Sequence, residues 1–286
     1  MRSLLNRVLG STRCFDAYQR LKAISGLGSM IRWVARWTFP PNQGRWVEVR
    51  NGLGQGLNLF VLPRYELAYI RGDHEPTIQS VLSSVLRRGE VFFDVGAHVG
   101  FFSLIAARLV GSEGSVFAFE PDPDNFARLR ANISRNGMAW VRPICAAACD
   151  RRGTATFVRS ALASSRMEGR VVGDESAVAA EVLPVDCVML DDEFSPRLGA
   201  VKVDVEGAEL LVLKGAPRLL AEGKLRWIVE AHSQELEAAV TKIFREANYG
   251  CRPISALRSP SRSDVAGRYV IAARGMQNDA PISSET

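Results

Sequence analysis

Short apolar runs alternate with helix-like segments along most of this chain, and this alternation limits the folds that it can adopt. The runs have the length and the content of buried strands, and we predict strands at 91–94, 115–120, 141–149, 200–204, 225–230 and 269–273. Helices are predicted at 101–110, 124–136, 210–220 and 235–247. Strands that alternate with helices form βαβ units with parallel strands. The pattern therefore predicts an α/β fold in which helices cover both faces of a mostly parallel sheet.

The rest of the 286 residues divides into an N-terminal extension and a tail. We predict a basic helical extension at residues 1–45, one α/β domain at 46–275 and a disordered tail at 276–286. Residues 1–50 carry nine Lys and Arg against two acidic residues, a charge of +7, so the rest of the chain contributes −2 to the total of +5. Two interpretations of the extension stay open. It is a helical cap with its arginines in water, or it makes peripheral contact with an anionic membrane surface.

The chain has five cysteines without a CxxC pair, and only three histidines. This content gives no zinc-binding pattern, and we expect all five thiols to be reduced, as is typical of cytoplasmic proteins. No run approaches the ~20 apolar residues of a membrane-spanning helix. The first residues also lack the apolar core of a signal peptide. We therefore expect a cytoplasmic protein without a transmembrane segment.

The turn between the strand at 91–94 and the next helix reads Asp94-Val-Gly-Ala-His-Val-Gly100. Glycines at such a turn let a ligand approach the backbone, and the N–H groups at a helix start favour an anion. The dinucleotide fingerprint G-x-G-x-x-G would need glycine at His98 and Phe101, so the turn does not fit NAD. It fits S-adenosylmethionine, whose methionine carboxylate would lie at the helix start and whose amino group would pair with Asp94. The other contacts predicted in this loop are Gly96, Ala97, His98 and Gly100.

Glu120 ends the next predicted strand and is followed by Pro121. An acidic side chain at this position accepts hydrogen bonds from both hydroxyls of a ribose. Parallel strands bring their C-terminal ends to one edge of a sheet. We therefore expect Asp94 and Glu120 to face the same ligand.

Three acidic residues and a histidine follow two later strands: Asp204, Glu206 and Glu209 after the first, and His232 after the second. Clustered carboxylates at a sheet edge are costly unless they meet a cation, a metal ion or a proton donor. We predict that His232 or a carboxylate of this cluster is the general base. Asp204 and Glu206 would also suit a divalent metal ion that orients a diol. Glu209 is equally well explained as a cap of the helix that follows it.

Several segments of the chain, taken in order, resemble the FkbM family of methyltransferases. They are Gly72–Glu75, Phe93–Ser103, Gly114–Asp122, Asn132 with Asn136, Val201–Glu209 and Val229–His232. One departure is His74, because the family usually has an aromatic residue before Glu75. The resemblance implies a Rossmann-like class I methyltransferase fold, with a seven-stranded sheet whose last strand is antiparallel.

The resemblance also implies a function. It indicates an S-adenosylmethionine-dependent O-methyltransferase that acts on a hydroxyl of a sugar, a glycolipid or a natural product. By position, Glu75 joins the predicted cofactor contacts, and Asp150 follows the third core strand, where an adenine contact is expected. Two other functions stay open, a nucleic-acid or protein methyltransferase and a non-catalytic module that binds a nucleoside ligand. The slightly acidic core disfavours a phosphate backbone, so we expect a small-molecule or glycan acceptor and no DNA.

Overall fold

The computed structural model describes residues 44–63, 65–159, 169–172, 181–193, 197–257 and 266–276. The predictions for the extension up to residue 43 and for the tail from residue 277 lie outside these ranges. Within them, no helix is long and apolar enough to cross a membrane.

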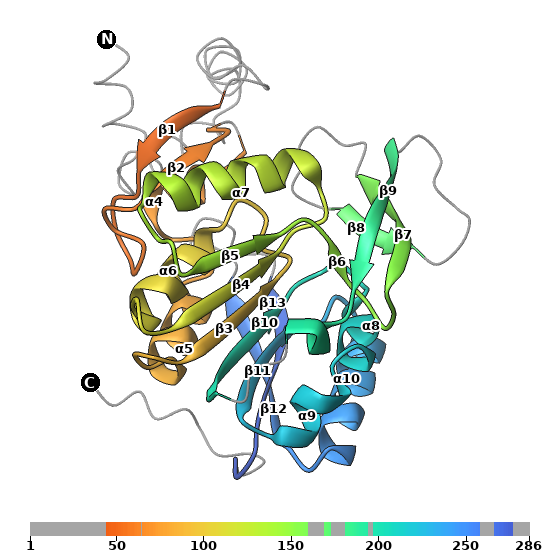
Figure 1. The fold of residues 1–286 in the computed structure, drawn as a ribbon. Coiled ribbons are helices and arrows are strands. Elements are labelled where there is room, and N and C mark those ends of the chain that lie inside the picture. The colour runs from red at the N-terminus through yellow and green to blue at the C-terminus, as the bar shows by residue number, and fades with distance from the viewer. Residues whose placement is uncertain are drawn as a thin grey trace, which may run out of the picture.

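A seven-stranded sheet lies at the centre of the described structure (Figure 1). Its strands are β3 (Val91–Val95), β4 (Ser115–Phe119), β5 (Val141–Ile144), β10 (Gly199–Val203), β11 (Leu225–Glu230), β12 (Gly250–Leu257) and β13 (Ala266–Ala273). Their order across the sheet is β12-β13-β11-β10-β3-β4-β5. β13 is antiparallel to both of its neighbours, and the other paired strands are parallel. The predicted seven-stranded sheet with an antiparallel last strand is confirmed.

The order of the strands places a switch point between β3 and β10. The chain enters the sheet at β3, continues outward through β4 and β5, and returns to the other side of β3 through β10 and β11. β3 and β10 are therefore neighbours, with Val95 opposite Val203. Ligands of open parallel sheets bind beyond the C-terminal strand ends at such a point. The loops that follow these two strands carry Gly96 to Gly100, Asp204 and Glu206, which are among the predicted cofactor and catalytic residues.

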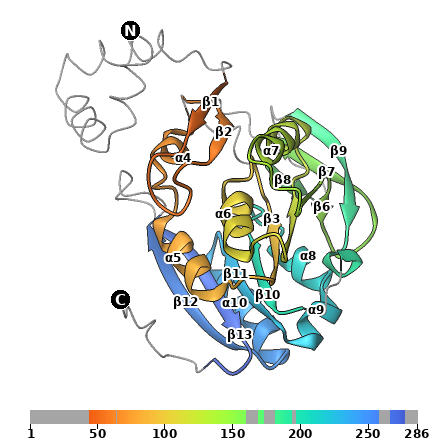
Figure 2. The same ribbon diagram turned by 60° about the vertical axis from the view of Figure 1, so that its left-hand side comes forward.

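Helices cover both faces of the sheet (Figure 2). One face carries α5 (Pro76–Val85), α6 (Phe101–Val110) and α7 (Pro123–Arg135), and the other carries α8 (Glu209–Lys214), α9 (Pro217–Glu222) and α10 (Gln234–Glu246). Adjacent residues of β3 serve the two cores, because Phe92 packs with the first set and Phe93 with the second. A strand that is buried on both faces reads as a continuous apolar run. The single helix predicted at 210–220 is instead two helices, since Pro217 cannot continue α8.

An N-terminal hairpin packs on α7. It consists of β1 (Arg45–Glu48) and β2 (Asn58–Val61), and the short helix α4 (Leu67–Arg71) follows it. Asn132 of α7 is fully buried and connects the hairpin to the loop after β3. Its Oδ1 accepts from the Phe60 N–H at 2.6 Å, and its Nδ2 donates to the Val99 carbonyl at 2.8 Å. One side chain therefore fixes both segments.

A second sheet lies beside β5. It contains β6 (Ala147–Ala148), β7 (Gly153–Arg159), β8 (Gly169–Val172) and β9 (Glu181–Val188) in the order β6-β9-β7-β8, and a short 3₁₀ helix, Leu190–Glu193, follows it. The predicted strand at 141–149 is therefore wrong in its second half. The core strand ends at Ile144, and the chain then changes sheets.

The structure joins Cys149 to Cys187 in a disulfide, with their Cα atoms 5.8 Å apart. The expectation that all thiols are reduced is therefore wrong for these two residues. Cys145 and Cys251 form no disulfide within the described residues, and Cys14 lies outside them. The disulfide removes the argument for a cytoplasmic setting that rested on reduced cysteines.

Candidate active site

Two loops meet at the C-terminal ends of β3 and β10. Gly96 has a φ of +85°, and a Cβ there would lie 1.9 Å from the carbonyl oxygen of Asp204. The Asp204 N–H donates to the Val95 carbonyl at 3.0 Å. Gly100 has a φ of +88°, and its Cβ would lie 2.5 Å from Leu129. Contacts within the protein therefore explain both glycines, so these glycines are not in themselves evidence of a ligand.

The backbone of this loop is also hydrogen-bonded within the protein. The N–H groups of Gly96 and Ala97 both donate to the Phe119 carbonyl, and that of Gly100 donates to Ala97. The His98 N–H donates to the Glu120 carboxylate at 2.7 Å. These groups are not free donors, so an anion at this edge would need the N–H groups of the first turn of α6.

Asp94 is buried near the end of β3 and has one oxygen without a partner. Its Oδ2 accepts from the Ser103 hydroxyl at 2.5 Å. Its Oδ1 has no hydrogen-bond partner within the described structure. Burial raises the pKa of the carboxyl group, and the nearby Lys202 opposes this effect. A buried acceptor with no partner is the group that an amine donor of a ligand would satisfy.

Glu120 directly follows β4 and faces the loop after β3. Its two oxygens accept from the N–H groups of His98 at 2.7 Å and of Asp122 at 2.9 Å. Burial raises the pKa of Glu120 to about 8. A carboxylate has about four lone-pair sites, so Glu120 can still accept from a hydroxyl beside these two N–H groups and the Asn125 side chain. The structure thus brings Asp94 and Glu120 to one edge of the sheet, as the sequence predicts.

Lys202 is a buried cation that was not among the site residues predicted from the sequence. It is 2% exposed, and its Nζ lies 2.9 Å from Asp204 Oδ2. Burial lowers the pKa of Lys202, but Asp204, Glu75 and Asp94 outweigh burial and raise it above its usual value. In the same way, burial raises the pKa of Asp204, while Lys202 and His232 hold it well below its usual range. The available signal was a lysine within a strand whose other residues are apolar.

His232 lies two residues after β11, between three carboxylates. Its Nε2 is 3.0 Å from Glu206 Oε2 and 3.9 Å from Asp204 Oδ1, and its Nδ1 is 3.0 Å from Glu209 Oε1. Burial lowers the pKa of His232, but the bonds to Glu206 and Glu209 outweigh burial and raise it to about 11. The ring is therefore an imidazolium at neutral pH, and it must lose a proton before it can act as a base.

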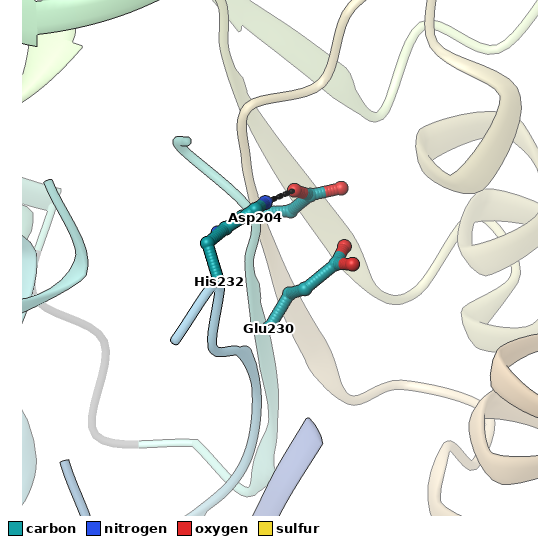
Figure 3. A group of neighbouring side chains, drawn as sticks. All are labelled: Asp204, Glu230 and His232. Carbon is teal, nitrogen blue, oxygen red and sulfur yellow. Dashed lines mark ion pairs between the residues drawn. The ribbon is translucent and has the colours of Figure 1, made fainter. Parts of the chain in front are cut away.

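Asp204, Glu230 and His232 lie together at the ends of β10 and β11 (Figure 3). Each offers an atom within 4.8 Å of the others, which is close enough for a shared metal ion. The carboxylates of this group already have cationic partners within the protein, because Lys202 pairs with Asp204 and both ring nitrogens of His232 face carboxylates. We therefore assign no metal ion to it.

Glu75 precedes α5 and reaches the same buried network from the N-terminal side. It has a φ of +44°, and its Oε2 accepts from the Tyr269 hydroxyl at 2.8 Å. The adjacent His74 takes the place of an aromatic residue, since its ring lies edge-on to Tyr69 at 4.5 Å between centroids. Burial lowers the pKa of His74. Glu75 is thus near the site, but its observed partners are side chains of the protein.

Asp150 does not directly follow the third core strand, contrary to the sequence-based prediction. It follows β6 in the second sheet, and its carboxylate pairs with Arg151 at 3.1 Å. The residue that directly follows the third core strand is Cys145. The adenine contact at Asp150 stays a prediction, for a residue that follows β6 instead of the third core strand.

Residues 94–251 match the family model of the methyltransferase FkbM domain, which is 158 of the 286 residues. Together, this match, the sheet topology and the edge with Asp94 and Glu120 define an S-adenosylmethionine-dependent methyltransferase. The chain belongs to the FkbM methyltransferase family.

The chain is also similar to several named proteins. The chain is 33% identical to hexuronic acid methyltransferase AglP of Haloferax volcanii, over 62% of this chain and 70% of the relative. It is 34% identical to 31-O-demethyl-FK506 methyltransferase FkbM of Streptomyces tacrolimicus, over 46% of this chain and 60% of the relative. The crystal structure of a methyltransferase FkbM from Methylobacillus flagellatus superposes with a TM-score of 0.48 at 15% identity, covering 85% of this chain and 60% of that one.

Proposed function

We propose that this enzyme methylates a hydroxyl oxygen of a sugar, a glycolipid or another natural product. The observation that carries the proposal is the position of His232, beside Asp204 and Glu206 at the strand edge that also holds Asp94 and Glu120. We infer that His232, once it has lost a proton, takes up the proton of the acceptor hydroxyl near the predicted cofactor residues. The names of the relatives, one acting on a hexuronic acid and one on a demethylated FK506, support the acceptor class.

The residues at the edge of β3 and β4 fit S-adenosylmethionine. Asp94 Oδ1 is a buried acceptor that needs a donor, and a ligand ammonium group supplies one. Glu120 has lone pairs left for ribose hydroxyls. The loop from Gly96 to Gly100 would shape the cofactor pocket between Asp94 and Glu120. When bound, the cofactor supplies an electrophilic methyl group on a sulfonium.

The acceptor hydroxyl loses a proton during methyl transfer, and we propose that His232 accepts it. Its Nε2 faces Asp204 and Glu206 at the partly exposed side of the cluster. The hydrogen bond with Glu206 contributes most to the raised pKa of His232. A hydroxyl that replaced Glu206 at Nε2 would therefore lower this pKa and produce a neutral ring able to accept a proton.

We propose that the reaction needs no metal ion. Lys202 places an ammonium group 2.9 Å from the Asp204 carboxylate, where a divalent ion would otherwise bind. Binding a metal ion there would require Lys202 to leave a buried position among acidic side chains, at a large cost in free energy.

The proposed function is tested first by cofactor binding. S-adenosylhomocysteine is titrated into the wild type, Glu120→Ala and the control Glu113→Ala, whose side chain is exposed. We expect binding to the wild type and the control, and a loss of at least about tenfold in affinity for Glu120→Ala. Equal affinity in all three proteins would remove Glu120 from the cofactor site.

The second test is transfer of a labelled methyl group to a panel of acceptors. The panel holds glycans with hexuronic acids, neutral glycans, hydroxylated macrolides, RNA and a protein mixture. We expect alkali-stable methyl ethers on one of the hydroxylated acceptors, and loss of turnover in Asp204→Asn but not in Asp192→Asn. Labelling confined to RNA or protein would contradict the proposal.

A further inference from the structure

Glu209 is the first residue of α8, and its side chain is 0% exposed. Its Oε1 accepts from the Gly207 N–H at 3.1 Å and lies 3.0 Å from His232 Nδ1. Its Oε2 has no hydrogen-bond partner in the described part of the chain. The Gly207 N–H lies at the start of the same helix, but His232 belongs to a different element, so capping of α8 explains only one of these two contacts.

A carboxylate at this depth needs a cation. Burial of an unpaired charge costs several kcal/mol, and removal of one partner of a buried pair is strongly destabilising. Among the described ion pairs, the one that reaches Glu209 comes from His232. The nearby cation Lys202 is turned toward Asp204 instead. The buried acceptor therefore requires His232 to keep a proton on Nδ1.

The other ring nitrogen has a partner of a different kind. Glu206, on Nε2, has a side chain that is 30% exposed. It lies in the loop between β10 and α8 and has a φ of +53°. A partly exposed carboxylate leaves an ion pair at a smaller cost because water can solvate it, whereas the Glu209 side chain is fully buried. Nδ1 of His232 therefore has a fixed partner, Glu209, and Nε2 has an exchangeable partner, Glu206.

We propose that Glu209 is the positioning residue of the active site, holding Nδ1–H of His232 so that Nε2 faces the acceptor hydroxyl. The inference rests on the proposed function. In the resting enzyme both nitrogens carry protons. An acceptor hydroxyl that takes the place of Glu206 releases the Nε2 proton to water. The acceptor oxygen then gives its own proton to Nε2 and bonds the methyl carbon, while the electron pair of the broken carbon–sulfur bond stays on sulfur.

The test uses the full chain with Glu209→Gln, which keeps the shape of the side chain and removes its charge. Glu235→Gln, on the exposed start of α10, is the matched control. The charged groups that face His232 are Asp204 and Glu206 from the loop after β10, Glu209 from α8 and Glu230 from β11. Because the variant changes one of them, the pH dependence of kcat reports its contribution.

We expect kcat of Glu209→Gln to fall by about ten- to a hundredfold, part of what a positioned base contributes. The acceptor KM and the S-adenosylhomocysteine affinity stay within about twofold of the wild type. The acidic limb of the kcat profile moves to lower pH by at least about one unit, since a carboxylate near the ring is lost. The control should behave as the wild type does.

An unchanged kcat and an unmoved acidic limb would overturn the inference. So would a loss of cofactor affinity in step with kcat, which is what a purely structural role predicts. If Glu209→Gln does not fold, Glu209→Asp is measured in its place, because it keeps the charge but shortens the reach. Wild-type kcat in that variant would also overturn the inference.

Failure of the proposed function itself would look different. The wild type would then methylate no hydroxyl at any pH. The nuclear magnetic resonance (NMR) titration of His232 does not depend on turnover, and it would still show whether Glu209 holds the ring. An unchanged His232 pKa in Glu209→Gln would overturn that pairing.

Discussion

The hydroxyl of Tyr269 lies 2.8 Å from Glu75 Oε2, although 194 residues separate them in the chain. The same hydroxyl lies 2.9 Å from Glu230 Oε2. One phenolic proton is thus shared between carboxylates from β11 and from the segment before α5. Through it, β13 is joined to β11 and to the segment before α5, beside the candidate site.

Tyr269→Phe should destabilise the protein, because two buried carboxylates lose a donor. We expect the free energy of unfolding to fall by about 1–3 kcal/mol, measured by urea denaturation. Tyr249→Phe is the control, since its buried hydroxyl donates to the neutral Leu220 carbonyl at 3.2 Å and should cost less. A larger loss in Tyr249→Phe would show that the pairing with Glu75 and Glu230 contributes little.

The three histidines should titrate in two separate ranges. Burial lowers the pKa of His74 and lowers that of His98 further, so both rings stay neutral at pH 7. His232 has a pKa raised to about 11 and stays charged. NMR of the imidazole C–H groups between pH 5 and 11 separates these cases. A His232 resonance that titrates near pH 6.5 would show that Glu206 and Glu209 do not hold the ring as described.

The same pairing makes stability depend on pH in a defined direction. The folded pKa of His232 is raised above its unfolded value of 6.5. Its contribution is therefore fully present below about pH 6.5 and is lost as the pH rises toward 11. We expect His232→Gln to flatten the decline of the melting temperature on the alkaline side. Parallel curves for the wild type and the variant would contradict this.

Asn132→Ala should weaken the link between the N-terminal hairpin and the cofactor loop. The substitution leaves the Phe60 N–H and the Val99 carbonyl without their partner. We expect a loss of about 2–4 kcal/mol in unfolding free energy and weaker binding of S-adenosylhomocysteine. Asn136→Ala, at a half-buried position that bonds the same hairpin through Asn58, should cost less and leave cofactor binding unchanged.

Lys202→Met should destabilise the protein by about 3 kcal/mol, because Asp204 and Asp94 lose their cation.

In the wild type, the same cation should make turnover independent of added metal. We expect equal kcat with EDTA and with added magnesium. Activity that EDTA abolishes and magnesium restores would contradict the assignment of Lys202 as the resident cation.

The sheet and the edge that carries the site were predictable from the sequence. Parallel strands bring their C-terminal ends together, so Asp94, Glu120 and Asp204 could be placed at one edge of the sheet from the strand pattern alone. The length of the third strand was not predictable, because Ala147 and Ala148 are as apolar in the second sheet as they would be in the first. For that reason Asp150 was expected after the third core strand, whereas it follows β6.

Partners that are distant in the chain were the least predictable. The pairing of Glu209 with His232 spans 23 residues and joins a helix to a loop, so neither residue indicates the other. Cys149 and Cys187 lie 38 residues apart in a chain with no regular cysteine spacing. Lys202 did carry a signal, since a lysine inside an apolar strand needs a buried acid.

The close approach of Gly96 to Asp204 couples the loop after β3 to the loop after β10. Any side chain at position 96 would displace the Asp204 carbonyl before it met a ligand. A Gly96→Ala variant should therefore lose turnover through a shifted catalytic carboxylate, even when cofactor affinity is retained. Gly96 thus fixes the path of the backbone at Asp204 as well as the shape of the loop after β3, so a substitution at position 96 would reach the residues proposed for proton transfer.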